Sequence, residues 1–158
     1  MTVPHTEEDM MTGNLDTGKI LVGVDGSEAS VEALRHGQRL ATALNAPLEA
    51  WGCWEIPLGY QGYLAVGFDT FAHDAEETLK ETVITALGPD KPKNVSTHLV
   101  HGSARTVLIE GSKQAAMLVV GRRGHGGFGG LLLGSVSSAC IAHAHCPVVV
   151  VHSPESST

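Results

Sequence analysis

Short apolar runs alternate along the chain with longer segments whose apolar positions are spaced as on one side of a helix. The apolar runs extend over Lys19 to Val24, Leu48 to Trp54, Val95 to Val100, Met117 to Gly121 and Pro147 to His152. Their short length and their content of aliphatic and β-branched residues are typical of strands. The pattern therefore predicts a strand at each of these runs.

The segments between the runs predict helices, over Ser27 to Leu44, Asp69 to Leu87, Ser103 to Ala115 and Ser135 to His143. Ser27 follows the turn signal Asp-Gly and can cap the first helix, whereas Gly88 and the proline after it end the second. Gly111 weakens the third helix. The Gly- and Tyr-rich segment from Gly59 to Gly67 predicts a loop.

Strands that alternate with helices indicate an α/β fold with a single five-stranded parallel open sheet and helices on both faces. With a strand order of 3-2-1-4-5, the order reverses between the first and fourth strands, and ligands bind at such a switch point. Two loops rich in polar groups or glycine follow these strands. One contains Asp25, and the other begins at Gly121.

The length and composition are those of one ordinary globular domain. The chain has 158 residues, of which 42% are hydrophobic and only 4% aromatic, so aliphatic side chains must fill the core. We interpret residues 1–18 as a disordered leader, 19–152 as the folded domain and 153–158 as a flexible tail.

The charge and the cysteines exclude several classes of protein. The net charge of -7 argues against a nucleic-acid-binding protein and against attraction to an acidic membrane, although Arg122 and Arg123 form a local basic spot. No apolar run approaches the length of about 18 residues that spans a membrane, and the polar leader is unlike a secretion signal. Three cysteines, an odd number, favour free thiols and a cytoplasmic location.

The segment from Gly121 to Ser135 has the most distinctive composition in the chain. It is rich in glycine, follows a predicted strand and leads into a predicted helix. Glycine lets the backbone bend sharply and bring its N–H groups close to an anion. The free N–H groups and the positive dipole end of the helix favour the same ligand. The segment therefore predicts a phosphate-binding site.

The spacing of these glycines resembles the nucleotide-binding signature of the universal stress protein family, G-x2-G-x9-G-[ST], which Gly121, Gly124 and Gly134-Ser135 match completely. Three other segments resemble the family's first strand with its acidic turn, its entry into the third helix and its closing strand. They are Val22 to Ser27, Val100 to Ala104 and Cys146 to Val151. The similarity extends from about Lys19 to Val151. At Met117 the chain departs from the acidic residue that many members carry, and we expect only a local effect on the surface.

The resemblance implies an ATP-binding domain of the Rossmann-like, adenine nucleotide alpha hydrolase-like type, and a homodimer formed through the last strand, Val148 to Val151. Asp25 would lie beside the ribose and phosphates or a bound Mg or Mn ion. Backbone groups near Gly52 and Cys53 would contact the adenine. The phosphates would be bound by Gly121, Gly124, Gly134 and Ser135, with further contacts from Val136 and Ser137.

Simpler interpretations exist for two of these residues. Ser135 can be a plain helix cap, a role compatible with phosphate binding, and Asp25 can be a turn former. His125 can meet phosphate or remain solvated. Trp51 and Trp54 point to opposite faces of their strand, which predicts one in the core and the other in a lid or groove.

Two other motifs carry less weight. Gly13 to Lys19 has P-loop spacing, but Ile20 replaces the required Ser or Thr and no strand precedes the motif. Cys140, His143, His145 and Cys146 could suggest zinc, but a helix end whose dipole is neutralised by histidine is the simpler interpretation.

The sequence favours a nucleotide-dependent regulatory or stress-response protein. The alternative is a slow ATPase or nucleotidyl-transfer enzyme, for which Asp25 and His125 are the only candidate groups near the loop. A purely structural dimerisation module is a third interpretation, and the intact glycine spacing argues against it. Whether the protein is an enzyme is left open, with binding favoured over hydrolysis.

Overall fold

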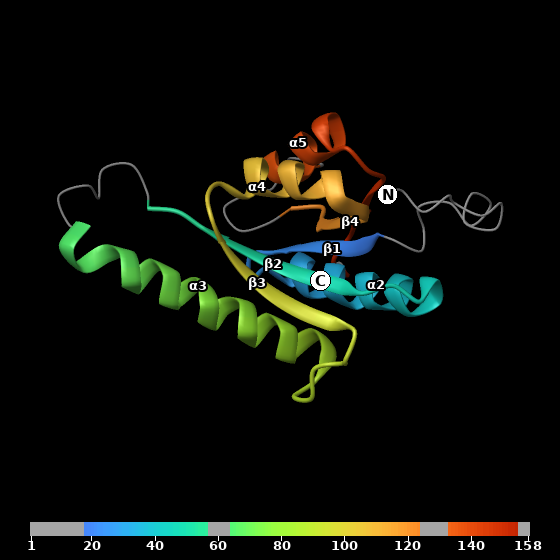
Figure 1. Cartoon of the computed structure of the whole chain (residues 1–158), viewed down its shortest axis with the longest axis horizontal. Helices are drawn as coiled ribbons and strands as arrows, with labels where there is room; N and C mark the ends of the chain where they lie inside the picture. The colour runs from blue at the N-terminus through green and yellow to red at the C-terminus, as the bar shows by residue number, and fades with distance from the viewer. Residues whose placement is uncertain (1–17, 57–63, 124–132, 155–158) are drawn as a thin grey trace, which may run out of the picture.

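A computed structural model of the chain describes residues 18–56, 64–123 and 133–154, and for residues 64–68 it describes the backbone only. The fold is a parallel sheet with helices on both faces (Figure 1). Its elements in chain order are β1 (Lys19–Val24), α2 (Glu28–Leu44), β2 (Leu48–Trp54), α3 (Leu64–Leu87), β3 (Val95–His101), α4 (Ala104–Gly111), the short 3₁₀ helix η3 (Ser112–Gln114), β4 (Ala115–Gly121), α5 (Ser135–His143) and β5 (Val148–Val151).

The sheet has the predicted order, β3-β2-β1-β4-β5, and each pair of neighbouring strands is parallel. This confirms the fold class expected from the sequence. The order reverses at β1, which lies between β2 and β4, so the carboxyl ends of these three strands meet at one edge of the sheet. That edge is where a ligand is expected in an open α/β sheet.

The helices divide into two pairs, one on each face of the sheet. Helices α2 and α3 pack together below the sheet in Figure 1, and α4 and α5 pack together above it. The core between the sheet and the first pair contains Ile20, Leu34 and Leu48, whose side chains have no exposed surface. Leu21 and Leu118 point to the second pair and are equally buried.

Several helix ends lie at residues whose type favours a helix cap. Ser27 is the N-cap of α2, as predicted, and its side chain accepts a hydrogen bond from the Ser30 N–H. Asn45 ends this helix in the left-handed conformation with φ of 52°. Ser103 caps α4 in the same way as Ser27 caps α2, with Thr106 N–H as the donor.

Two boundaries were predicted wrongly. Helix α3 begins at Leu64, so residues 64–67 of the expected loop are helical, because the penalty of about 1 kcal/mol for Gly67 does not end a long helix. The rest of that loop, residues 57–63, lies outside the described residues. Helix α4 ends at Gly111, and Ala115 already belongs to β4. A side chain at Gly111 would lie 2.7 Å from Trp51 Cζ3, so glycine lets this helix end approach the sheet closely.

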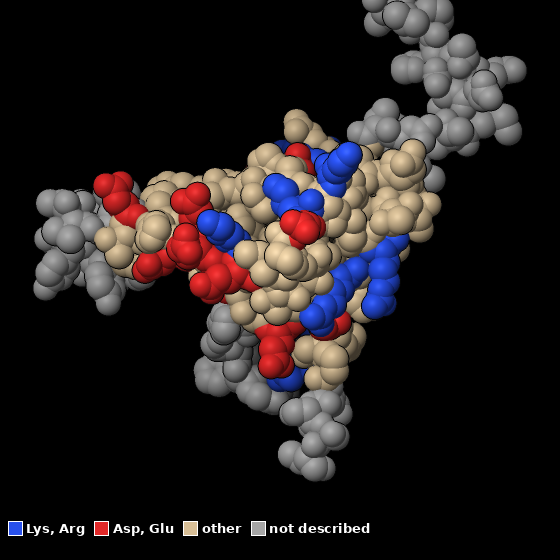
Figure 2. Space-filling view, turned by 90° about the horizontal axis from the view of Figure 1, so that it is seen from below, with Lys and Arg blue, Asp and Glu red and all other residues tan. Residues whose placement is uncertain are grey.

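Two further findings concern the thiols and the surface. Cys53, Cys140 and Cys146 are free, as expected. No helix within the described residues is long and apolar enough to cross a membrane. Figure 2 shows acidic groups gathered on one side of the face seen from below, and α3 exposes Asp69, Asp74, Glu76, Glu77 and Glu81. This surface repels polyanions.

Candidate functional site

A cavity of about 160 Å³ lies where the carboxyl ends of β1, β2 and β4 meet the first turns of α4 and α5. Its lining contains most of the residues that the sequence singled out. These are Asp25, Cys53, Gly121, Gly134, Ser135, Val136 and Ser137. The two loops predicted to face one another thus contribute to one site.

The turn after β1 is built by Asp25 and Ser27. Asp25 Oδ1 accepts hydrogen bonds from the Ser27 N–H at 2.9 Å and from the Ser27 hydroxyl at 2.5 Å. Gly26 between them has φ of 85°, which favours glycine. Asp25 is therefore a turn former, as the simpler interpretation held, and at the same time an exposed carboxylate on the cavity wall.

The glycine-rich segment leaves the sheet at the end of β4, where the backbone is very close to α2. A Cβ on Gly121 would lie 2.6 Å from Ala29 Cβ, so a larger residue here forces β4 and α2 apart. The segment returns at Gly134, whose N–H donates to the Arg122 carbonyl oxygen at 2.7 Å. Gly124 lies within residues 124–132, outside the described part of the chain, so its predicted phosphate contact stays a prediction.

The first turn of α5 forms the polar wall of the cavity. Gly134 is its N-cap, with φ of -75° and ψ of 169°, and it supplies no side chain to the free N–H groups. The interpretation of Ser135 as the helix cap was therefore wrong, because Ser135 is the first helical residue. Ser135 is exposed, whereas Ser137 is buried. Uncapped N–H groups at a helix start attract an anion.

The opposite wall is largely apolar. Trp51 and Cys53 reach it from β2 and Leu108 from α4. Burial raises the pKa of the Cys53 thiol to about 11, and the nearby Cys140 and Glu55 add to this effect. A neutral thiol beside an indole suits a flat, weakly polar group more than a charged one.

Gly52 does not line the cavity in this structure. A side chain at this position would point to the other side of the sheet, where an added Cβ would lie 3.3 Å from Leu79 of α3. Of the two residues of the predicted adenine contact, its neighbour Cys53 is the one that lines the cavity. Strand alternation explains the difference, because adjacent residues point to opposite faces.

Several lining residues were not assigned to the site by the sequence. Trp51 could have been found from Cys53, since residues two apart on a strand share a face. Arg123 belongs to the basic spot that the sequence did show. Ser30 and Leu108 carried no local signal, because a helix places them at the cavity through tertiary packing alone. Trp54 instead stacks with His101, with ring centroids 4.3 Å apart.

The proposed alternatives can be located as well. In the part of the chain that the structure describes, no group of three or more His, Cys, Asp or Glu side chains is placed to hold a metal ion. Most of the P-loop-like segment lies outside the described residues. Its last residue, Lys19, forms an ion pair of 2.7 Å with Glu49.

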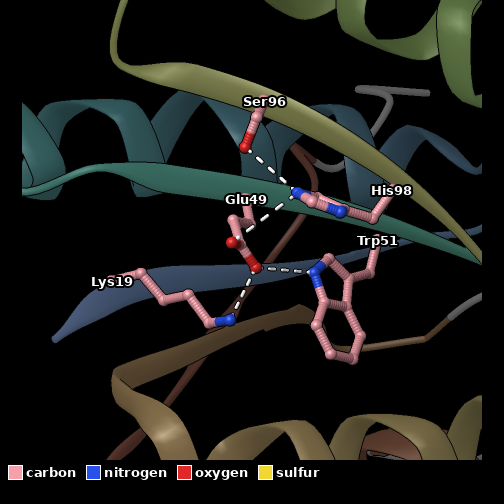
Figure 3. Close-up of polar contacts among 5 residues, drawn as sticks. All are labelled: Lys19, Glu49, Trp51, Ser96 and His98. Atoms are coloured by element: carbon pink, nitrogen blue, oxygen red, sulfur yellow. Dashed lines mark hydrogen bonds and ion pairs between the residues drawn. The ribbon is translucent and has the colours of Figure 1, made fainter.

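A second polar cluster surrounds Glu49 on the face of α4 and α5 and shares Trp51 with the cavity wall (Figure 3). Glu49 accepts hydrogen bonds from Lys19 and from the Trp51 indole N–H, the latter at 2.9 Å. His98 Nε2 lies 3.6 Å from Glu49 and 3.2 Å from Ser96 Oγ. Both neighbours contact the same ring nitrogen, whereas a Ser-His-acid triad needs them on different nitrogens. The cluster is therefore a structural network.

The fold and this site define a class of protein: a parallel α/β domain with a cavity at the switch point of the sheet, lined by glycine residues and the start of a helix. Residues 17–152 match the sequence model of the universal stress protein family. The chain belongs to this family.

Individual relatives agree with that assignment. A universal stress protein of Mycobacterium tuberculosis is 37% identical over 155 residues, which cover 93% of this chain and 51% of the relative. The chain thus spans about half the length of the curated relatives it matches.

Solved structures show the same fold. The universal stress protein UspA from Lactobacillus plantarum superposes with a TM-score of 0.71 at 22% identity, covering 85% of this chain and 97% of that protein. A universal stress protein in complex with cAMP superposes with a TM-score of 0.55 at 25% identity, covering 87% and 98%. The fold is therefore the adenine nucleotide alpha hydrolase-like fold of this family.

Proposed function

We propose that the chain binds an adenine nucleotide in the cavity, with ATP as the ligand, and acts as a nucleotide-dependent regulatory protein in the stress response. The observation that carries the proposal is the pairing of two unlike walls in one cavity. Trp51 and Cys53 form an apolar side, and the uncapped start of α5 with Gly121 forms an N–H-rich side. A base fits the first side and phosphates the second.

The cAMP complex of the similar universal stress protein supports a nucleotide in general. The preference for ATP rests on the length of the glycine-rich segment, which offers many N–H groups to a triphosphate. Among the described lining residues, Asp25 is the only carboxylate. One carboxylate fits Mg²⁺ or Mn²⁺ that takes its other ligands from phosphate oxygens and water.

We further propose a homodimer through the edge strand β5 and a cytoplasmic location. Val148, Val149 and Val150 remain half-buried at the open edge of the sheet, where a second copy of the strand can pair. Three free thiols fit a reducing compartment. Asp25 is also the group on which a slow ATPase would depend, and its hydrogen bonds to Ser27 favour the turn role.

The test compares Gly134→Asp with Gly134→Asn. Both residues are good N-caps and have the same shape, so both variants should fold and share any crowding of the Arg123 backbone, whose Cα lies 3.3 Å from the added Cβ. Only Asp places a negative charge at the cradle. We expect titration calorimetry to show ATP binding to the unaltered protein and to Gly134→Asn. Gly134→Asp should bind at least about tenfold more weakly than Gly134→Asn.

Absence of ATP binding to the unaltered protein would contradict the proposal, and so would equal affinities of the two variants. The same samples, followed for hours for ADP formation, test the ATPase alternative. Product formed by the unaltered protein beyond that of an Asp25→Ala variant would favour an enzyme. A titration with ADP and cAMP in place of ATP gives the preference for phosphate number.

A further inference from the structure

Ser137 is a buried polar residue in the first turn of α5, and its hydrogen bonds reach beyond its own helix. Its side chain is only 3% exposed. The Oγ atom lies 2.8 Å from the Arg122 carbonyl oxygen and 3.1 Å from the Gly134 carbonyl oxygen. A hydroxyl has one hydrogen, so Ser137 donates to one of these oxygens at a time or shares it between them.

The bond to Gly134 is the ordinary contact that a helical serine makes with the carbonyl three residues before it. The bond to Arg122 is different, because it joins residues 15 positions apart across the whole glycine-rich segment. Local helix stabilisation explains the bond to Gly134. It does not explain the bond to Arg122.

Arg122 is held from two sides. Its N–H donates to the Val151 carbonyl oxygen of β5 at 2.8 Å, and its own carbonyl oxygen accepts from the Gly134 N–H as well as from Ser137. The segment leaves the sheet beside Arg122 and returns at Gly134. We call these bonds, made by Arg122, Gly134, Ser137 and Val151, the neck of the segment.

We propose that Ser137 is a positioning residue for the nucleotide phosphates, which it serves by closing the neck. The inference rests on the proposed function. Its hydroxyl hydrogen is already donated to a backbone carbonyl, so Ser137 acts on the ligand through the backbone it holds. The bond fixes the end of β4 against the start of α5, and Gly121 and Ser135 line the cavity from these two sides.

Closing the neck preorganises the side of the cavity that we propose binds the phosphates. Without the hydroxyl, the Arg122 carbonyl loses one of its two donors and the neck opens more often. Part of the binding free energy of the nucleotide is then used to bring the N–H groups back together. The affinity therefore falls, although no group that touches the ligand has been removed. The apolar wall at Trp51 and Cys53 is not affected.

The experiment compares Ser137→Ala, Ser137→Thr and the neighbouring control Ser138→Ala. Thr keeps the hydroxyl, and Ser138 is exposed. Affinities are measured for ATP and, by competition against a fluorescent adenine nucleotide, for adenosine. We expect Ser137→Ala to bind ATP about tenfold more weakly and adenosine unchanged within about twofold. Ser138→Ala should match the unaltered protein, and Ser137→Thr should regain most of the affinity for ATP.

A second measurement needs no nucleotide. Amide hydrogen exchange of Gly134, whose N–H donates to Arg122, should be about tenfold faster in Ser137→Ala, with Leu21 and Val119 in the core unchanged. If crowding prevents Ser137→Thr from folding, this exchange still tests the neck.

Three outcomes would overturn the inference. One is an unchanged Gly134 exchange rate. Another is equal ATP affinity of Ser137→Ala and the unaltered protein. The third is an equal loss for ATP and adenosine, which would place the effect on the cavity as a whole. Failure of the unaltered protein to bind ATP would reject the proposed function, and the positioning role with it. If Gly134 exchange were still faster in Ser137→Ala in that case, the neck would have a structural role only.

Discussion

The two faces of the sheet are covered to different extents. On the face of α2 and α3, Ile20 and Leu48 have no exposed surface, and Gln38 and Asn94 form a neutral, half-buried amide pair. On the face of α4 and α5, the strands near β3 carry the charged Glu49 network, and His98 is 44% exposed. The cavity opens on this second face.

This difference indicates that one face of the sheet mainly provides stability and the other provides the cavity. The closed face buries aliphatic side chains almost completely, which is the main source of stability in a domain of this size. The second face gives up part of that burial and gains a cavity walled by Trp51, Cys53 and Leu108. We therefore expect equal substitutions on the two faces to have unequal effects on stability and on ligand binding.

The largest effect is expected for truncation of a core leucine. Leu34 on α2 is fully buried, and Leu108 on α4 is only 2% exposed but borders the cavity. Leu34→Ala leaves a sealed void and should lower the free energy of unfolding by about 4 kcal/mol, whereas Leu108→Ala enlarges an existing cavity and should cost about 2 kcal/mol. Urea denaturation measures both.

Nucleotide binding sharpens this comparison. Leu108→Ala should weaken ATP binding, because it removes part of the apolar wall, and Leu34→Ala should leave the affinity unchanged at a temperature where both variants are folded. Equal costs for the two substitutions, or a larger loss of affinity in Leu34→Ala, would show that the faces do not divide the tasks in this way.

A smaller effect is expected at the helix caps that flank the cavity from the two faces. The Ser27 hydroxyl accepts from Ser30 N–H and donates to Asp25, and it is nearly buried. The Ser103 hydroxyl makes its bonds to Thr106 in an exposed position. Ser27→Ala should therefore cost about 1.5 kcal/mol of unfolding free energy and Ser103→Ala about 0.5 kcal/mol, in the same urea assay. A larger cost at Ser103 would contradict the ranking.

The caps also show what the sequence could predict. Ser27 follows Asp-Gly and precedes an amphipathic segment, so its role is encoded within a few residues. The strand order could be predicted for a similar reason, since alternating strands and helices leave few arrangements. The glycine spacing predicted a site at the end of β4, and Gly121, Gly134 and Ser135 do line one cavity with Asp25.

Features that depend on distant partners could not be predicted. The end of α4 at Gly111 reflects close approach to Trp51 of another element. The bond of Ser137 to Arg122 depends on how the glycine-rich segment returns to the sheet. Ser30 reaches the cavity only because α2 starts beside it. Periodicity and turn signals describe neighbours in the chain, and these contacts join residues far apart in it.

The smallest effect expected is the pH dependence of the polar contacts on the two faces. Burial acts to raise the pKa of Glu49, but hydrogen bonds from Lys19 and Trp51, together with the positive charge of Lys19 and that of His98 when protonated, outweigh it and lower this pKa below its ordinary value of 4.5. A carboxylate whose pKa is lower in the folded state stabilises the fold above the unfolded pKa. That contribution is lost as the pH falls through the folded pKa.

Glu49→Gln should therefore cost about 0.5 to 1 kcal/mol of unfolding free energy near about pH 7, and the cost should shrink as the pH is lowered to about 3.5. Gln38→Ala on the other face breaks a neutral amide pair, so its cost should be the same at both pH values. Urea denaturation of the two variants and the unaltered protein at each pH measures both differences. A cost of Glu49→Gln that persists at the lower pH would mean that the shape of the network around Trp51 stabilises this face, and the charge of Glu49 does not.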